Sequence, residues 1–317
     1  MSSPLWIGLD AGGSHVHGLM GAATGGILSE IELPEGANPN FVGIEVSAGL
    51  LERAISELRK DRAVCGIFAA VAGALTGDHS QRLEGLLSAR FSVPVRVGSD
   101  VVSVLEAAPE LPEAAICILS GTGFSAFART AYDAPLLRVR GWGARFEQSA
   151  SGYALGREIL REALREDELR QGGGAEQSPS PLLQAVRRSL SLEDATPLTG
   201  ALDRLLNMPI RDVATFARFA FDPSVCPSAL QMRLVRDLAE EVSAAIDDLV
   251  CLSPVPIRSV LFSGGIATAV FPRLVSLLTE RFSGFRFYLP SLTPAEGALR
   301  HARRLFSSSS LEITPHA

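Results

Sequence analysis

The chain has 317 residues, of which 47% are hydrophobic and 20% are charged, so it is long enough to form two domains with separate cores. The formal net charge of −6 argues against a nucleic-acid-binding surface. The longest apolar runs, such as 114–119, are too short to cross a membrane, and no signal peptide is visible. We therefore expect a cytoplasmic protein that binds neither nucleic acid nor a membrane.

The cysteines and histidines give no metal-ligand pattern. Cys65, Cys117, Cys226 and Cys251 are widely spaced, and no pair has metal-ligand or redox spacing. They are interpreted as buried free thiols of a reducing compartment. The spacing of the histidines likewise predicts no zinc site.

The first third of the chain is predicted to alternate strands and helices, with an antiparallel flank beside a parallel core. The predicted strands span 5–10, 16–21, 27–32, 64–70 and 93–97, and the helices 44–60, 78–90 and 101–108.

The pattern of strand, glycine turn and further strands begins again near residue 115, which indicates two related α/β domains. Strands are predicted at 115–119, 124–129, 136–140, 259–262 and 285–289, and helices at 151–165, within 181–250 and at 294–306. The polar segment 166–180 is interpreted as an exposed loop. Trp142, which lies between two glycines, is expected to pack rather than to stack on a ligand.

Glycine-rich turns end three of the predicted strands. They are DAGGS at 10–14, SGTGF at 120–124 and SGGIA at 263–267. Glycine allows the backbone to approach a ligand closely and to direct N–H groups at it. Any one turn could be an ordinary connection, but three at strand ends, where ligands of α/β proteins gather, favour a phosphate-handling site.

Two acids and an asparagine accompany these turns. Asp10 is a candidate magnesium ligand, because this hard cation prefers oxygen donors. Asp100 could be a helix N-cap, and this position is compatible with a catalytic role at a strand end. Asn38 could serve only the turn before Pro39, although we favour a ligand contact.

Together these motifs resemble those of the actin-like ATPase superfamily, which contains sugar kinases, Hsp70 and actin. Within it the chain is most similar to the group of N-acetylglucosamine kinases and BadF/BadG/BcrA/BcrD ATPases, over nearly its whole length. The matching segments are DAGGS, GANPN at 36–40, AVAGA at 70–74, SDVVSVLEAA at 99–108, SGTGF, GWGARFEQSASGYALGREIL at 141–160, SGGIA and PAEGAL at 294–299.

The resemblance implies two actin-like, ribonuclease H-like α/β domains facing each other across a nucleotide-binding cleft. The first comprises 1–112 and 296–317 with the sugar-binding loop, and the second comprises 113–295 with the adenosine site and a helical insertion. The implied activity is ATP-dependent phosphorylation of a hydroxyl of an amino sugar, N-acetylglucosamine or glucosamine-like. A small sugar is the implied partner, and a homodimer is left open.

The resemblance also implies roles for individual residues. Asp100 would be the general base, and Asp10 would organise Mg²⁺ on ATP. The phosphate and nucleotide contacts would come from Gly12, Gly13, Ser14, Gly121, Thr122, Gly123, Gly264 and Gly265. The substrate contacts would come from Asn38, Gly73, Asp100 and Gln148.

One segment departs from the pattern of the group. The usual Gly-Asp-Glu-Gly is replaced by residues 147–150, so that its two acids correspond to Gln148 and Ser149. This change predicts an altered acceptor preference and keeps two alternatives open. One is a non-catalytic sugar- or nucleotide-binding regulator. The other is a partner-activating ATPase of the BadF type, which the cysteine spacing disfavours.

Overall fold

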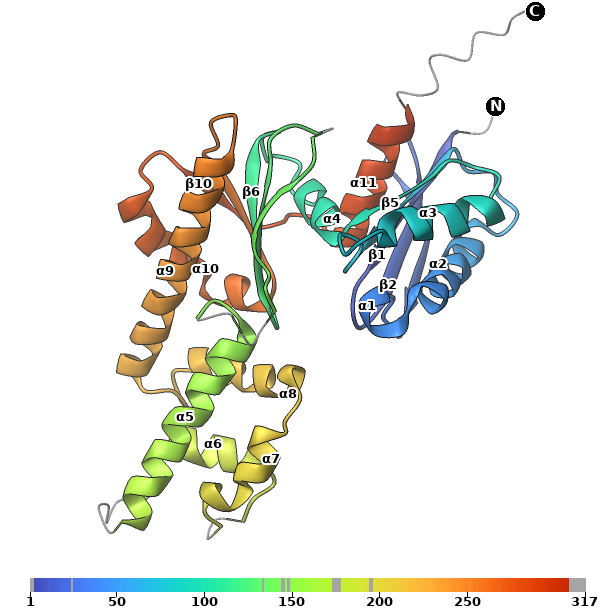
Figure 1. The fold of residues 1–317 in the computed structure, drawn as a ribbon. Coiled ribbons are helices and arrows are strands. Elements are labelled where there is room, and N and C mark those ends of the chain that lie inside the picture. Colours follow the sequence, from blue (N-terminus) through green and yellow to red (C-terminus); the bar gives the residue numbers. More distant parts are fainter. Residues whose placement is uncertain are drawn as a thin grey trace, which may run out of the picture. The chain divides into compact units, whose positions relative to one another are not determined.

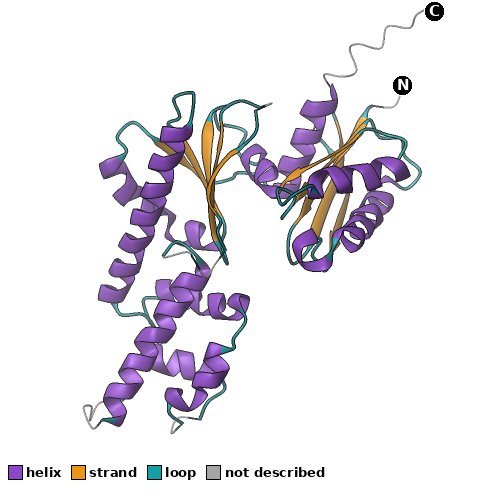
Figure 2. Cartoon of the chain, in the orientation of Figure 1, coloured by secondary structure: helices purple, strands orange, loops and turns teal. Residues whose placement is uncertain are grey.

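The computed structural model describes residues 3–23, 25–132, 134–143, 146, 149–172, 178–193 and 196–307. The chain forms two compact units, one comprising 1–111 and 290–317 and the other 112–289 (Figures 1 and 2). Each unit contains a five-stranded sheet in the order β3-β2-β1-β4-β5 or β10-β9-β6-β7-β8. The mixed α/β class expected from the sequence is confirmed.

The first sheet combines antiparallel and parallel pairing. Its strands are β1 (Leu5–Ala11), β2 (Val16–Ala22), β3 (Ile27–Leu33), β4 (Gly66–Val71) and β5 (Val95–Ser99). β1 pairs antiparallel with β2 and parallel with β4. Because alternate side chains of a strand point to opposite faces, Ile7 and Leu9 enter one apolar cluster and Trp6 enters another.

Helices cover both faces of this sheet. α2 (Ile44–Arg59) and α3 (His79–Arg90) contribute to the cluster around Ile7, and α11 (Pro294–Ser307) contributes to the cluster around Trp6. The short helices α1 (Pro39–Val42) and α4 (Asp100–Glu106) follow the loop and the strand that carry candidate site residues. α11 therefore returns from the far end of the chain to complete the core of this unit.

The second sheet has the same mixture of pairings. It contains β6 (Ala115–Ser120), β7 (Phe124–Arg129), β8 (Leu137–Arg140), β9 (Ser259–Ser263) and β10 (Arg286–Tyr288). β6 pairs antiparallel with β7 and parallel with β9. The glycine turns of this unit consequently follow two neighbouring strands, β6 and β9.

The remaining elements of the second unit are helical. They are α5 (Gly152–Gln171), α6 (Pro181–Ser189), η1 (Leu198–Ala201), α7 (Leu202–Leu206), α8 (Ile210–Thr215), η2 (Phe216–Phe221), α9 (Ser228–Leu252) and α10 (Gly265–Arg281). α9 and α10 contact strands of the sheet, whereas α5 contacts α6, α8 and η2. One apolar cluster joins the sheet and these helices.

Two sequence-based expectations about the second unit are wrong, and a third, that all four cysteines are buried, is wrong for two of them. Residues 166–171, predicted as loop, continue α5, in which Asp167 is buried and bound to Arg187 and the Leu198 N–H. Trp142, expected to pack in the protein, is 64% exposed. Its ring lies beside the Arg140 guanidinium, 5.4 Å from the ring centre.

Only two of the four thiols are buried. Cys117 and Cys226 lie inside the protein, whereas Cys65 and Cys251 are exposed because they lie just outside a strand or at the end of a helix. Burial raises the pKa of the Cys226 thiol to about 11. Among the described helices, none has a stretch long and apolar enough to cross a bilayer.

Candidate functional site

The carboxyl ends of three neighbouring strands bring the acids of the first unit together. Asp10 of β1 lies opposite Ala70 of β4, and Val71 of β4 lies opposite Ser99 of β5. The Ala72 N–H continues this edge by donating to the Ala11 carbonyl at 2.9 Å. Parallel pairing thus places Asp10 and the Ser99–Asp100 segment at the same edge of the sheet.

A buried serine links the two acids. The Ser103 hydroxyl lies 3.0 Å from Asp10 Oδ1 and 2.6 Å from the carbonyl oxygen of Asp100. Asp100 Oδ1 accepts hydrogen bonds from the Ser99 hydroxyl at 3.0 Å and from the Val101 N–H at 3.1 Å. The N-cap of α4 is Ser99 and not Asp100, which is the first helical residue.

The environment of Asp10 disfavours its ionised form. Burial raises the pKa of its carboxyl from 3.8 to about 6, while the Ser103 hydrogen bond lowers it and the neighbouring Asp100 charge raises it. Burial and the Asp100 charge both disfavour the ionised carboxylate, so a cation that binds Asp10 would stabilise its charged form.

The first glycine turn is closed internally and rests on the loop at 36–38. The Gly12 N–H donates to the His15 carbonyl at 3.0 Å, and the Ala37 N–H donates to the Gly12 carbonyl at 3.0 Å. A Cβ on Gly36 would lie 2.2 Å from the Gly13 carbonyl oxygen, so only glycine permits this approach. Gly13 and Ser14 are exposed, whereas the Gly12 amide, expected to face a ligand, is used inside the turn.

The loop carrying Asn38 meets the end of β4. Asn38 is the N-cap of α1, where its Oδ1 accepts from the Asn40 N–H at 3.0 Å. Gly73 has a φ of +83°, and a Cβ on it would lie 2.4 Å from Asn38 Oδ1. Asn38 therefore has the turn role considered from the sequence and also lies beside Gly73.

In the second unit the turn after β6 is seated on the beginning of α5. The Gly121 N–H donates to the Gly123 carbonyl at 3.0 Å, and the carbonyls of Gly121 and Thr122 accept from Gly152 and Tyr153 at 2.7 and 3.1 Å. Thr122 itself is exposed. Gly264, at a φ of +95°, approaches Ser120 so closely that a Cβ would lie 2.4 Å from its carbonyl oxygen. The two turns of this unit are thus adjacent.

A cavity of about 600 Å³ opens beside Gly265 at the start of α10. Residues of α8, η2 and the turn after η2 form its other side. The lining residues are Ala214, Thr215, Ala217, Arg218, Phe221, Asp222, Gly265, Ile266 and Ala269. The cavity has the mixed apolar and polar walls that small-molecule sites use.

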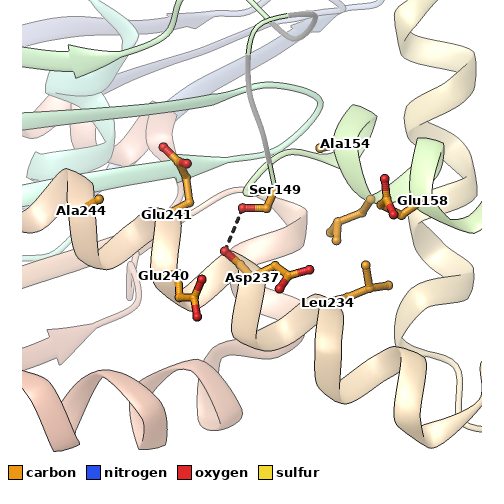
Figure 3. Close-up of a pocket in the computed structure, with 9 residues that line it drawn as sticks. Ser149, Ala154, Glu158, Leu234, Asp237, Glu240, Glu241 and Ala244 are labelled. Carbon is orange, nitrogen blue, oxygen red and sulfur yellow. Dashed lines mark hydrogen bonds between the residues drawn. The ribbon is translucent and has the colours of Figure 1, made fainter.

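Ser149 lies in a different cavity, of about 430 Å³, between α5 and α9 (Figure 3). Its hydroxyl donates to the backbone carbonyl of Asp237 at 2.8 Å. Four carboxylates line this cavity, and three of them pair with arginines: Glu241 with Arg140, Glu158 with Arg161 and Arg233, and Asp237 with Arg233. Gln148, predicted to contact the substrate, lies outside the described residues.

Sequence reasoning missed Ser103 and the cavity wall at 214–222. Ser103 follows Asp100 by three positions, which places it on the same side of a helix, and this spacing was the available signal. The residues at 214–222 meet Gly265 only through tertiary packing, for which the sequence offers no periodic pattern.

A scan against models of known protein families finds no match, and no curated protein matches the chain. Solved structures do match. Two candidate N-acetylglucosamine kinases, from Chromobacterium violaceum and Porphyromonas gingivalis, each give a TM-score of 0.67 at 20% and 18% identity. Each comparison covers 95% of this chain, and 100% and 99% of the other chain respectively.

A ROK family glucokinase from Streptomyces griseus, solved in complex with glucose and AMPPNP, gives a TM-score of 0.56 at 19% identity. It is covered over 99% of its length by 96% of this chain. At these identities the likeness establishes the fold, and the chain has the two-domain actin-like fold of these sugar kinases.

Proposed function

We propose that the protein is an ATP-dependent kinase that phosphorylates a hydroxyl group of a sugar. The observation that carries the proposal is the placement of Asp10 and Asp100 at one edge of the sheet, where the buried Ser103 hydroxyl binds the Asp10 carboxylate and the backbone carbonyl of Asp100. The exposed turn at Gly13–Ser14 and the Asn38–Gly73 contact belong to the same unit. The fold neighbours, which include a glucokinase solved with glucose and AMPPNP, support the same reaction class.

Asp100 is the proposed general base. Its carboxylate accepts the proton of the sugar hydroxyl while the hydroxyl oxygen forms a bond to the terminal phosphorus of ATP. The bond between that phosphorus and its bridging oxygen breaks, and ADP leaves with the electron pair. The hydrogen bonds from Ser99 and Val101 to Oδ1 orient the carboxyl group for this transfer.

Asp10 is the proposed magnesium-binding residue. Magnesium is commonly held by one or two carboxylates together with phosphate oxygens and water, and the buried charge of Asp10 beside Asp100 fits that use. The bound cation would neutralise phosphate charge during transfer. Among the described residues no cluster of three or more His, Cys, Asp or Glu side chains could form an all-protein metal cage.

The glycine turns are proposed to bind the nucleotide. Gly13, Ser14 and Thr122 offer exposed backbone and hydroxyl groups for phosphate, and the half-buried Gly121 and Gly123 form the turn that carries Thr122. The cavity beside Gly265 is proposed to take the adenosine, with Phe221 and Ile266 as apolar walls.

The proposed acceptor is an amino sugar. Asn38, held beside Gly73, is placed to hydrogen-bond sugar hydroxyls or an acylamino group. Two of the fold neighbours are candidate N-acetylglucosamine kinases. The absence of the usual acids at 148 and 149 leads us to propose a preference different from that of ordinary enzymes of this kind.

The test is ADP release measured with ATP and Mg²⁺ over a panel of hexoses, hexosamines and N-acetylhexosamines, alongside ligand-induced shifts of the melting temperature. We expect sugar-dependent ADP release. Asp100→Asn should lower kcat by about 10²–10⁴-fold, the usual contribution of a general base, with ATP binding retained. Its melting temperature should change little, because Ser99 caps α4.

Two results would contradict the proposal. Sugar and nucleotide binding without any turnover would instead identify a non-catalytic regulator. ATP hydrolysis that no sugar accelerates would favour an ATPase that acts on a partner protein.

A further inference from the structure

Ser103 has an unusual position for a serine inside a helix. It lies in α4, is completely buried, and has two acceptors within reach of its one proton, Asp10 Oδ1 at 3.0 Å and the Asp100 carbonyl at 2.6 Å. A bond to the carbonyl three residues earlier is ordinary for a helical serine. The contact with a carboxylate 93 residues away in sequence is not, and it requires an explanation.

The location of Ser103 is fixed from outside the helix. A Cβ on Gly297 of α11 would lie 2.0 Å from the Ser103 carbonyl oxygen, so the backbones of α4 and α11 are in direct contact. Gly8 of β1 permits a similarly close approach to Leu299 of α11. α11 therefore contacts both the strand that carries Asp10 and the helix turn that carries Ser103.

Among the described residues, Ser103 is the one side chain that donates a hydrogen bond to Asp10. Without this bond the largely buried carboxylate would lose its fixed orientation and a compensating donor. We propose that Ser103 is a positioning residue. Its hydroxyl holds the Asp10 carboxylate in the orientation that binds the metal–nucleotide, and keeps this carboxylate beside the backbone of Asp100. This inference rests on the proposed function of Asp10 and Asp100.

The proposal is tested with Mn²⁺ in place of Mg²⁺, because free Mn²⁺ is measured directly by electron paramagnetic resonance. Mn²⁺ is titrated into the full-length protein in the presence of ADP. Ser103→Ala should weaken Mn²⁺ binding about tenfold, equivalent to about 1.4 kcal/mol. It should lower kcat by a similar factor while KM for the sugar changes little, because Asn38 and Gly73 are untouched.

Ser103→Thr supplies the matched control, because threonine keeps the hydroxyl and can still bond to a carbonyl of the preceding turn. Mn²⁺ affinity within about twofold of the unaltered protein is expected for it. The Asp10→Asn background provides a second comparison, since Ser103→Ala should cause no further loss there if the two residues act as a unit.

A purely structural role gives a different result. Ser103→Ala would then lower the melting temperature while Mn²⁺ affinity and kcat stay at the original values, or its effects would add to those of Asp10→Asn, and either result overturns the inference. Normal Mn²⁺ binding by Asp10→Asn would overturn the proposed role of Asp10 and this inference together. Sugar phosphorylation that persists while Ser103→Ala has no effect would overturn the inference alone.

Discussion

Keeping the Asp10 carboxyl ionised at the candidate site lowers the stability of the folded protein. The pKa of its carboxyl is about 6 in the folded protein against an ordinary value of 3.8, chiefly because burial disfavours the ionised form. The folded state thus binds a proton more tightly than the unfolded state does. The stability that this proton contributes is fully present below about pH 4 and is lost as the pH rises through about 6. Above that pH the free energy of unfolding is lower by about 3 kcal/mol than it is below pH 4, as far as Asp10 determines it.

Asp10→Asn should remove this cost. We expect the variant to melt at a higher temperature than the unaltered protein at pH 8, with the difference shrinking as the pH falls from 6 to 4.5, and to lack kinase activity. Thermal unfolding of the metal-free protein across pH 4.5–8 measures it, with the exposed Asp61→Asn as the control. An equal shift at pH 4.5 and pH 8 would show that Asp10 is not the titrating group.

At the scale of loops, the contact between Gly73 and Asn38 joins the end of β4 to the segment before α1. Gly73 adopts a φ of +83°, and the site of its missing Cβ is already taken by side-chain atoms of Asn38 and Asn40. A side chain there would strain the backbone and displace Asn38. The loop position therefore depends on glycine for two separate reasons.

Gly73→Ala should raise KM for the sugar about tenfold or more, the effect of strain of 1–3 kcal/mol passed to the acceptor loop, and leave KM for ATP nearly unchanged. Steady-state kinetics with each substrate varied gives both values. Gly77→Ala is the matched control, because Gly77 also has a positive φ, +55°, but has open space around its missing Cβ. Equal effects of the two substitutions would mean that backbone strain alone is responsible.

At the scale of helices, the first turns of α10 form one wall of the cavity of about 600 Å³. Ala269 lines this cavity and is exposed, so a larger side chain there fills the cavity without entering the core. Ala269→Phe should raise KM for ATP at least about tenfold, by occupying space that the nucleoside needs. The sugar KM should stay the same.

Isothermal titration with ADP provides a direct measurement of this effect. Thr279→Phe serves as the control, because Thr279 is exposed on the last turns of the same helix and does not line the cavity. Unchanged ADP affinity in Ala269→Phe would place the adenosine elsewhere.

For the whole molecule, the sequence predicted the architecture better than the site. Apolar runs that end in glycine turns predicted β1, β6 and β9, because the apolar run indicates a buried strand and the glycines indicate the turn that follows it. The extension of α5 to Gln171 was missed, since its polar sequence is stabilised by the buried Asp167–Arg187 pair. Ser103 and the cavity beside Gly265 were missed because long-range packing creates them.

The first unit is built from two separate stretches of the sequence, and this predicts which part of the molecule unfolds when α11 is displaced. α11 lies against β1 so closely that a Cβ on Gly8 would sit 2.0 Å from the Leu299 nitrogen. Trp6, Phe68 and Leu299 form the apolar cluster at this contact, whereas the second unit has its own cluster. Loss of the α11 contact should therefore affect one unit only.

Gly8→Val should force α11 away from β1 and destabilise the first unit by about 1–3 kcal/mol or more, the usual cost of overpacking. Hydrogen exchange measured by mass spectrometry should show faster exchange in β1, β4, α4 and α11 and unchanged exchange in the described segments of 112–289. Gly49→Val is the control, because nothing lies within 4 Å of the missing Cβ of Gly49. If exchange accelerated equally in both units, the molecule would open as a single cooperative body, and α11 would stabilise more than the unit it completes.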